Sequence, residues 1–367
     1  MENNASGKPR NTESLQCPSL SHNPHGLLRP STEETLLPLN CCVKTSLSNK
    51  REETQKWNGL KIVRGKKLLK DLSTSGIGGP CKYFVEVLDQ TQLLSAIRYC
   101  HEHSIRYIII GKGSNCLFDD VGFEGCVILN QIKFLERKES GIYRAVSGFR
   151  FNGLGVLSVN EGFTGLEFAR GIPRTVGGAT YMNAGANGQE TADVIVSVDI
   201  VTVEGELRTL DRNDLKFDYR SSLFQDMKDL AAIIAVTFRL EESRSARRKQ
   251  EEYLERRRMT QPLGDRTAGS VFRNPSDIGV AAAELIEKAG LKGIRLGGAM
   301  VSKVHANLFI NVSDATSQDM LNLIDLVMDK IDRKFEVRLF EEVIYYHPYS
   351  NNLNSNRDNV TFANKME

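Results

Sequence analysis

Glycines mark the part of the sequence with the clearest potential to bind a ligand. Residues 162–188 contain seven glycines and one proline and carry few charges, although 26% of the whole chain is charged. An internal glycine costs a regular helix or strand about 0.5–1 kcal/mol relative to alanine, so we expect neither element here. Apolar residues such as Leu166 and Phe168 argue against a flexible linker. The composition predicts a buried, irregular path whose backbone N–H groups approach a phosphate-bearing or flat aromatic cofactor; the alternative is a packed turn without a ligand.

A second glycine-rich stretch, residues 111–115, directly follows the buried strand predicted at 106–110. Its sequence Gly-Lys-Gly-Ser-Asn offers successive backbone N–H groups and the Ser114 hydroxyl, which suit the oxygens of a pyrophosphate. It is neither a Walker loop nor a Gly-x-Gly-x-x-Gly sequence opening a helix, and alone it is equally typical of a plain turn. Because ligands of α/β units bind at the carboxyl ends of strands, we expect the two glycine-rich stretches to converge on one ligand.

Apolar periodicity predicts the elements that must position these stretches. Strands are predicted at 83–88, 106–110, 127–129, 143–146, 194–203, 231–240 and 307–311. Helices are predicted from Asp89 or Thr91 to His103, at 152–160, 243–259 and 281–289, and from Asp314 or Thr316 to Arg333. The strand–helix–strand order at 83–110 is typical of a βαβ unit. The apolar stripe on the last helix is expected to face the core.

Composition limits the classes of function that the chain can have. Its 367 residues predict two or three domains. A net charge of +2 gives no basic stripe for nucleic acid, and glutamates interrupt the basic run 244–258, which we interpret as a solvated helix face. No apolar run approaches the roughly 18 residues that span a bilayer. Seven cysteines without metal-ligand spacing predict free thiols in a reducing compartment and no metal site.

The first 56 residues differ in composition from the rest of the chain. They are rich in Ser, Asn, Pro and Thr and have no stable apolar period, so we expect disorder, with order beginning at Trp57. They lack the apolar core of a secretory signal. A transit peptide is the favoured interpretation, although Glu2, Glu13, Glu33 and Glu34 argue against it. A transit peptide would place the protein in the plastid stroma; otherwise we expect it in the cytoplasm.

Taken together, these motifs and several others resemble one family, the UDP-N-acetylenolpyruvoylglucosamine reductases (UDP-N-acetylmuramate dehydrogenases). The resemblance covers about residues 58–346 and looks like the compact second type of the family. It rests on segments 74–80, 111–115, 165–173, 182–185, 219–222, 261–262, 268–275, 289–293 and 305–307, which occur in the family's order.

The resemblance implies an α+β fold, with a two-lobed FAD-binding domain of the vanillyl-alcohol-oxidase (PCMH) type before a smaller α+β substrate-binding domain. The implied division is an extension at 1–56, a first lobe at 57–128, a second lobe at 129–242, a helical connector at 243–262, a substrate-binding domain at 263–334, a strand returning to the first lobe at 335–346, and a tail at 347–367. The implied partner is a UDP-sugar, with no nucleic acid or membrane, and we expect a monomer.

The implied activity is that of an NADPH-dependent oxidoreductase of peptidoglycan precursor synthesis. NADPH reduces the FAD, and the reduced flavin reduces the enolpyruvyl double bond of UDP-N-acetylglucosamine enolpyruvate to the lactyl ether of UDP-N-acetylmuramate. Two alternatives stay open at this stage. One is a related FAD-dependent oxidoreductase acting on another hydroxy acid or sugar, and the other is a non-catalytic flavin-binding partner module.

The resemblance also implies roles for individual residues. Catalytic roles fall to Arg220, Ser270 and Glu342. Cofactor binding falls to Gly111, Lys112, Gly113, Ser114, Asn115, Gly171, Ile172, Pro173, Thr175, Gly177, Gly178, Asn183 and Gly185. Substrate binding falls to Tyr219, Arg273, Asn274, Lys303 and His305. Without the resemblance, Arg220 and Glu342 would be interpreted as surface residues and Ser270 as a turn serine.

These residue types suit the chemistry. Reduction of the enolpyruvyl group places charge on a carbon beside a carboxylate, so the site must stabilise an enolate and then protonate it. Arg220 can grip a carboxylate through two N–H groups, Ser270 can donate the proton, and Glu342 can orient or polarise them. We expect Gly177→Val to release the flavin, because its Cβ and methyl groups would block close approach of the backbone.

The sequence departs from the family pattern at three points. Arg174 follows Gly-Ile-Pro where a small residue is usual, and it would either crowd the flavin or pair with its phosphates. Lys112 occupies a loop position that is often glycine. The usual Leu-Glu-Pro-Glu-Val becomes Leu-Phe-Glu-Glu-Val at 339–343, which keeps the second glutamate as Glu342.

Overall fold

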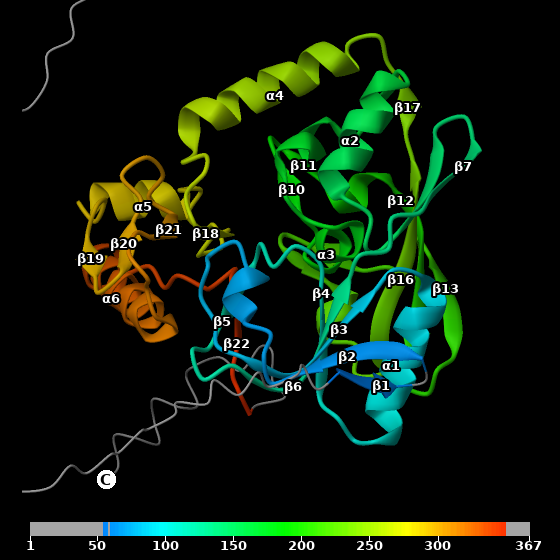
Figure 1. The fold of residues 1–367 in the computed structure, drawn as a ribbon. Coiled ribbons are helices and arrows are strands. Elements are labelled where there is room, and N and C mark those ends of the chain that lie inside the picture. The colour runs from blue at the N-terminus through cyan, green and yellow to red at the C-terminus, as the bar shows by residue number, and fades with distance from the viewer. Residues whose placement is uncertain (1–53, 58, 350–367) are drawn as a thin grey trace, which may run out of the picture. The chain divides into compact units, whose positions relative to one another are not determined.

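The computed structural model describes residues 54–57 and 59–349, so the predictions for most of the extension and for the end of the tail lie outside it. Figure 1 shows the arrangement of its elements. Order begins slightly earlier than expected, because strand β1 spans Thr54–Trp57 and pairs with β2, Leu60–Arg64. Trp57 is buried and its ring stacks on Tyr99, with centroids 4.2 Å apart.

The first sheet has the strand order β1-β2-β3-β6-β4. Its other strands are β3 (Cys81–Val87), β4 (Tyr107–Ile110) and β6 (Phe123–Asn130), and α1 (Gln90–Glu102) connects β3 to β4. Asp89 caps α1 by accepting a hydrogen bond from the Gln92 N–H, as one of the two sequence alternatives had it. The expected βαβ unit is present with β3 and β4 parallel, but β6 lies between them and pairs with both.

The second sheet has the antiparallel order β13-β12-β16-β8-β7. Its strands are β7 (Leu135–Glu139), β8 (Ile142–Val146), β12 (Ile195–Thr202), β13 (Leu207–Asp211) and β16 (Leu230–Arg239). The sequence analysis missed the edge strands β7 and β13. Both are mostly exposed, so they lack the apolar pattern by which the central strands were recognised. Helix α2 (Phe151–Asn160) confirms the prediction at 152–160.

The glycine-rich stretch contains more regular structure than expected. It holds β9 (Phe163–Thr164), the 3-10 helix η2 (Glu167–Gly171), α3 (Val176–Tyr181) and β10 (Gly185–Ala186), followed by β11 (Gln189–Glu190). The prediction that no helix would form was wrong for α3. The Thr175 hydroxyl caps α3 by accepting from the Gly178 N–H, and Gly177 lets the helix approach Ser147 closely. This packing and the cap offset the propensity cost of two glycines.

The C-terminal part forms a third sheet with the order β18-β21-β20-β19. Its strands are β18 (Thr267–Ser270), β19 (Arg295–Leu296), β20 (Ala299–Val301) and β21 (Leu308–Asn311), and its helices are α5 (Ala282–Lys288) and α6 (Ser317–Phe335). Thr316 and Asp319 form a capping box on α6. The apolar stripe of α6 is buried in this core, as predicted, through Met320, Leu323, Ile324, Val327 and Ile331.

Two connections join the C-terminal part to the rest of the chain. Helix α4 (Ala246–Thr260) leads from β17 (Glu241–Glu242) to β18 (Figure 1). The chain then returns through β22 (Ile344–Tyr346), which pairs in parallel with β5 (Cys116–Phe118). The remaining short elements are β14 (Phe217–Asp218), β15 (Ser221–Ser222) and the 3-10 helices η1 (Leu69–Asp71), η3 (Thr191–Val194) and η4 (Leu223–Gln225).

Removing residues 1–49 is expected to leave folding and cofactor content unchanged. The prediction rests on the low apolar periodicity of the extension, and the structure moves the safe starting point ahead of Thr54, where β1 begins. A chain beginning at Lys50 should match the full-length protein in soluble yield and in bound FAD per mole. A chain beginning at Leu60 is the control, because it lacks β1 and the buried Trp57 and should unfold at lower urea concentration. The prediction would be contradicted if the chain beginning at Lys50 lost FAD while the full-length protein kept it.

Candidate active site

The two glycine-rich stretches meet in the structure, as the sequence predicted. A Cβ on Gly111 would overlap the Thr175 side chain, and Asn115 accepts a hydrogen bond from Nη2 of Arg174 at 2.8 Å. The loop needs Gly113, which has φ 58° and would strike the Leu72 carbonyl if it carried a Cβ. The 111–115 loop, which follows β4 of the first sheet, therefore lies against residues 174–175 at the start of α3.

The carboxylate of Glu342, which is predicted to be catalytic, reaches this place on the returning segment. The backbone N–H of Ile344 donates to the Asn115 carbonyl at 2.9 Å, and the Asn115 amide nitrogen donates to the Glu342 carbonyl at 3.0 Å. Only 7% of the Glu342 side chain is exposed. Its Oε1 lies 3.3 Å from Nε of Arg220 and 3.7 Å from Nη2 of Arg174. Two guanidinium groups thus share one buried carboxylate oxygen.

Arg220 is held in position by the backbone around it. It has φ 54°, in the left-handed region, in the turn between β14 and β15. Its Nη2 donates to the Gly185 carbonyl at 2.8 Å, and its Nη1 lies 3.7 Å from Glu190. Asn183 supports this arrangement, since its amide nitrogen donates to Glu190 at 2.7 Å and its oxygen accepts from the Ala192 N–H. The strained backbone and fixed guanidinium indicate a group set in advance for an anion.

Ser270 ends β18 next to the backbone of Glu342. The carbonyl of the next residue, Val271, accepts the Glu342 N–H at 2.7 Å. The Ser270 side chain is half-buried, and its hydroxyl has no hydrogen-bond partner within residues 54–57 and 59–349. A Cβ on Gly269 would lie 3.5 Å from the Ser114 carbonyl, so the strand end also touches the 111–115 loop. The structure therefore brings the side chains of Arg220 and Glu342 into contact and places the backbone next to Ser270 against that of Glu342.

Several features of the site fit a bound FAD. Burial lowers the pKa of Lys112, and the charges of Arg150 and Lys133 lower it further, so this end of the first sheet is short of negative charge. A pyrophosphate would supply that charge. The Thr180 hydroxyl is buried without a hydrogen-bond partner among the described residues. A Cβ on Gly178 would meet only the Thr175 hydroxyl, at 3.5 Å, which leaves room for a ligand to approach α3.

Other glycines of the predicted cofactor set approach protein atoms in the structure. A Cβ on Gly177 would lie 2.8 Å from Cβ of Ser147, and the Gly177 N–H donates to the Ser147 carbonyl. A Cβ on Gly171 would lie 2.8 Å from Cδ of Arg257, and one on Gly185 would strike the Gln189 carbonyl at 2.5 Å. Ile172 is buried and Pro173 is exposed. The cofactor roles of these residues stay predictions, and the reason for glycine at 177 is packing against Ser147.

The predicted substrate residues divide into two groups. Arg273 Nε and His305 Nδ1 are buried and lack hydrogen-bond partners in the described part of the chain, so both have capacity for a ligand. The Tyr219 ring lies beneath the Arg220 guanidinium, 4.8 Å from its centroid. The Asn274 oxygen instead accepts from the Ala282 N–H at the start of α5, and Lys303 is exposed beside Gly293. Their roles toward a substrate stay predictions.

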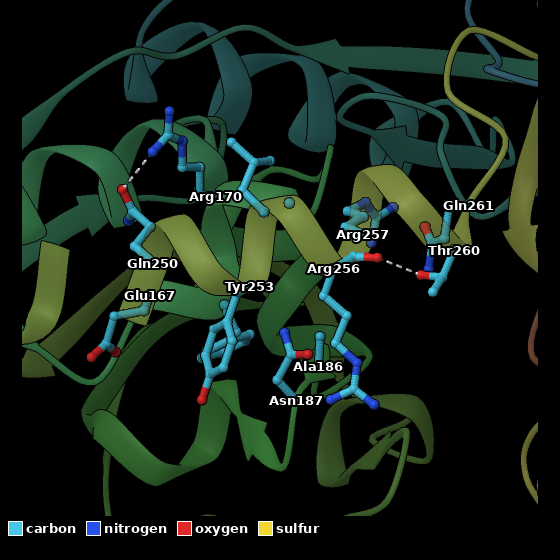
Figure 2. Close-up of a pocket in the computed structure, with 13 residues that line it drawn as sticks. Glu167, Arg170, Ala186, Asn187, Gln250, Tyr253, Arg256, Arg257, Thr260 and Gln261 are labelled. Carbon is cyan, nitrogen blue, oxygen red and sulfur yellow. Dashed lines mark hydrogen bonds between the residues drawn. The ribbon is translucent and has the colours of Figure 1, made fainter. Parts of the chain in front are cut away.

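A cleft of about 90 Å³ beside α4 adds two arginines that the sequence analysis missed. Figure 2 shows Arg256 and Arg257 near the end of α4, with Ala186 and Asn187 beside the Arg256 side chain. Burial lowers the pKa of Arg257. Neither arginine forms an ion pair with a described acid. The expectation that the whole basic run is a solvated face was therefore wrong for Arg257, whose guanidinium lies near Gly171.

The fold and site define the class of protein as an FAD-binding flavoprotein. Residues 81–211 match the model of an FAD binding domain. Residues 261–346 match the model of the C-terminal domain of UDP-N-acetylenolpyruvoylglucosamine reductase.

The particular family follows from the whole-chain comparisons. A UDP-N-acetylenolpyruvoylglucosamine reductase of Protochlamydia amoebophila is 50% identical over 285 residues, covering 78% of this chain and 94% of the relative. One of Chlamydia abortus is 42% identical over 281 residues, with 77% and 93% covered. The crystal structure of the Thermus caldophilus enzyme matches with a TM-score of 0.66 at 30% identity and covers 78% of this chain and 99% of that one. The chain belongs to the UDP-N-acetylenolpyruvoylglucosamine reductase family.

Substitutions at Gly177 and Gly178 should separate packing from cofactor binding. Gly178→Val places its side chain in open space, so the fold should persist while FAD binding weakens about tenfold or more. Gly177→Val would overlap Ser147 and should lower the free energy of unfolding itself, by about 1–3 kcal/mol. FAD content after gel filtration and urea unfolding of each variant measure the two effects. Full FAD content in Gly178→Val would remove this residue from the cofactor site.

The pKa of His305 should make folding stability pH-dependent. Burial lowers this pKa below its ordinary value of 6.5, and nearby Lys292 and Arg257 lower it further. The unfolded chain therefore binds a proton more readily, and this contribution to stability is lost as pH falls below about 6.5. His305→Gln should lose less free energy of unfolding than the wild-type protein between pH about 7.5 and 5.5, measured in urea. Identical losses would contradict the effect.

Proposed function

We propose that the chain is an FAD-dependent oxidoreductase that uses NADPH to convert UDP-N-acetylglucosamine enolpyruvate to UDP-N-acetylmuramate in peptidoglycan precursor synthesis. The observation that carries the proposal is the contact between Arg220 and Glu342 where the two glycine-rich stretches meet, with the end of β18 at Ser270 against the Glu342 backbone. The near-complete coverage of the curated relatives supports it.

Each of the three residues has a role that its surroundings support. Bound FAD supplies the hydride that reduces the enolpyruvyl double bond. Arg220, fixed by the Gly185 carbonyl and by Glu342, holds the substrate carboxylate and offsets the charge that develops beside it. The Ser270 hydroxyl, which has no competing protein partner in the described residues, donates a proton to the substrate carbon. Glu342 keeps the Arg220 guanidinium aimed at the substrate.

The sugar nucleotide is expected to lie across the cleft at the end of α4. Arg256 and Arg257 offer two guanidinium groups without described acidic partners, which suits a diphosphate. Arg273 and His305 offer buried polar atoms without partners. We further propose that the protein acts as a monomer. None of the helices in the described residues has both the length and the apolar character of a membrane span.

The alternative of a related oxidoreductase with another substrate is tested by substrate dependence. NADPH consumption should rise strongly when the enolpyruvyl UDP-sugar is added to the FAD-loaded protein, and UDP-N-acetylmuramate should accumulate in equal amount. Consumption that proceeds equally with oxygen or a dye in place of this substrate would favour the related oxidoreductase. A flavin that NADPH does not bleach would favour a non-catalytic binding module.

A further inference from the structure

Arg174, which stands where the family pattern has a small residue, contacts the 111–115 loop and the carboxylate of Glu342. Its Nη2 donates to the Asn115 oxygen at 2.8 Å and lies 3.7 Å from Oε1 of Glu342. Only 13% of its side chain is exposed. Arg220 contacts the same carboxylate oxygen, so both guanidinium groups lie beside Oε1 of Glu342.

The surroundings of Arg174 are short of negative charge. Burial lowers its pKa, the charge of Arg220 lowers it further, and Glu342 opposes both effects. The Cys116 thiol near Arg174, and Tyr346 next to that thiol, stay neutral. Burial raises the pKa of the Cys116 thiol to about 11 and raises the pKa of Tyr346 well above its ordinary value. Glu190 also pairs with Arg220, but it is partly exposed, with 31% of its side chain accessible.

Arg174 also has donors to spare. Arginine carries five N–H donors, and in the described residues the only hydrogen bond from this side chain is the one from Nη2 to Asn115. This guanidinium is largely buried, has unused N–H donors and shares the one carboxylate beside it. It is therefore suited to bind a second carboxylate.

We propose that Arg174 and Arg220 together bind the substrate carboxylate, and that the charge of Glu342 keeps the two guanidinium groups close to each other to receive it. The inference rests on the proposed function. It gives this chain a two-arginine carboxylate site where the family pattern has a small residue. In this site Arg174 contributes to substrate binding and Asn115 orients its guanidinium.

The test compares two UDP-sugars that differ in the carboxylate. UDP-N-acetylmuramate carries it and UDP-N-acetylglucosamine does not, and both can be titrated calorimetrically into oxidised, FAD-loaded protein without turnover. Arg174→Met, which keeps the volume and removes the charge, should weaken binding of the first about 10- to 100-fold and leave the second within about twofold. Arg174→Lys should recover part of the loss.

Other outcomes would overturn the inference. An equal loss for both ligands would mean a general structural role, and no loss for either would mean that Arg174 does not meet the substrate. Slower bleaching by NADPH or reduced FAD content in Arg174→Met, with UDP-N-acetylmuramate binding unchanged, would place the guanidinium at the flavin. If Arg174→Met does not fold, Arg174→Gln serves with the same ligand pair and the same expected difference. Failure of the proposed function is distinguishable, because the wild-type protein would then fail to turn over the enolpyruvyl substrate.

Discussion

Ser270→Ala is expected to be bleached by NADPH at a near-normal rate, yet to be reoxidised by the enolpyruvyl substrate about 10²-fold or more slowly. Reduction of the flavin requires no proton on the substrate carbon, whereas completion of the product does. The structure is consistent with this separation, because Ser270 ends β18, the next residue bonds to the Glu342 backbone, and the Ser270 hydroxyl has no hydrogen-bond partner among the described residues. Stopped-flow absorbance of each half-reaction measures it.

Ser270→Cys is the informative companion variant. A thiol has similar reach and a lower ordinary pKa than a hydroxyl, so part of the lost rate should return. Equal slowing of both half-reactions in Ser270→Ala would mean that the serine is structural. The proton would then come from another group.

Glu342→Gln is expected to slow the same second half-reaction by about 10²–10³-fold. Glutamine keeps the size of the side chain and an oxygen for hydrogen bonding, but it removes the negative charge that Arg220 and Arg174 share. The two guanidinium groups would then repel each other in a buried site, and their orientation toward the substrate would be lost. Bleaching by NADPH should change much less. Single-turnover reoxidation of the reduced variant is the measurement.

Glu190→Gln provides a matched control for Glu342→Gln. It removes the other carboxylate near Arg220, which lies 3.7 Å from it and is more exposed than Glu342. Its reoxidation should slow by less than about fivefold, since surface ion pairs contribute little. Equal slowing in the two variants would contradict a specific role for Glu342 and indicate that Arg220 needs only one acidic neighbour of either kind.

The central elements of the fold could be predicted because their residues alternate or cluster by polarity. Strands β3, β4 and β16 and helices α1 and α6 follow from such patterns, as do the caps at Asp89 and Thr316. The insertion of β6 between β3 and β4 could not be predicted, because strand order depends on packing between distant segments. The edge strands β7 and β13 carry too few apolar residues to be recognised.

For the site, the sequence motifs named candidate residues, but they could not predict the contacts that these residues make in space. Gly177 was expected to meet a cofactor, which stays a prediction; the structure adds a close contact with Ser147, which lies in another segment and which no local pattern reveals. The position of Arg174 likewise depends on β22 pairing with β5, which carries Glu342 to the 111–115 loop. Arg257 lies within a run of basic residues that was interpreted as solvated. The one signal in the sequence that sets it apart is its position near the end of α4, just before the motif at 261–262.

The most direct test of the proposed function is the visible absorption spectrum of the purified full-length protein through one catalytic cycle. We expect the bands of bound oxidised FAD, bleaching on addition of NADPH without oxygen, and recovery of the bands on addition of UDP-N-acetylglucosamine enolpyruvate, with one UDP-N-acetylmuramate formed per flavin. A protein that binds no flavin, or one whose bleached flavin recovers its colour with oxygen but not with the enolpyruvyl substrate, would contradict the proposal.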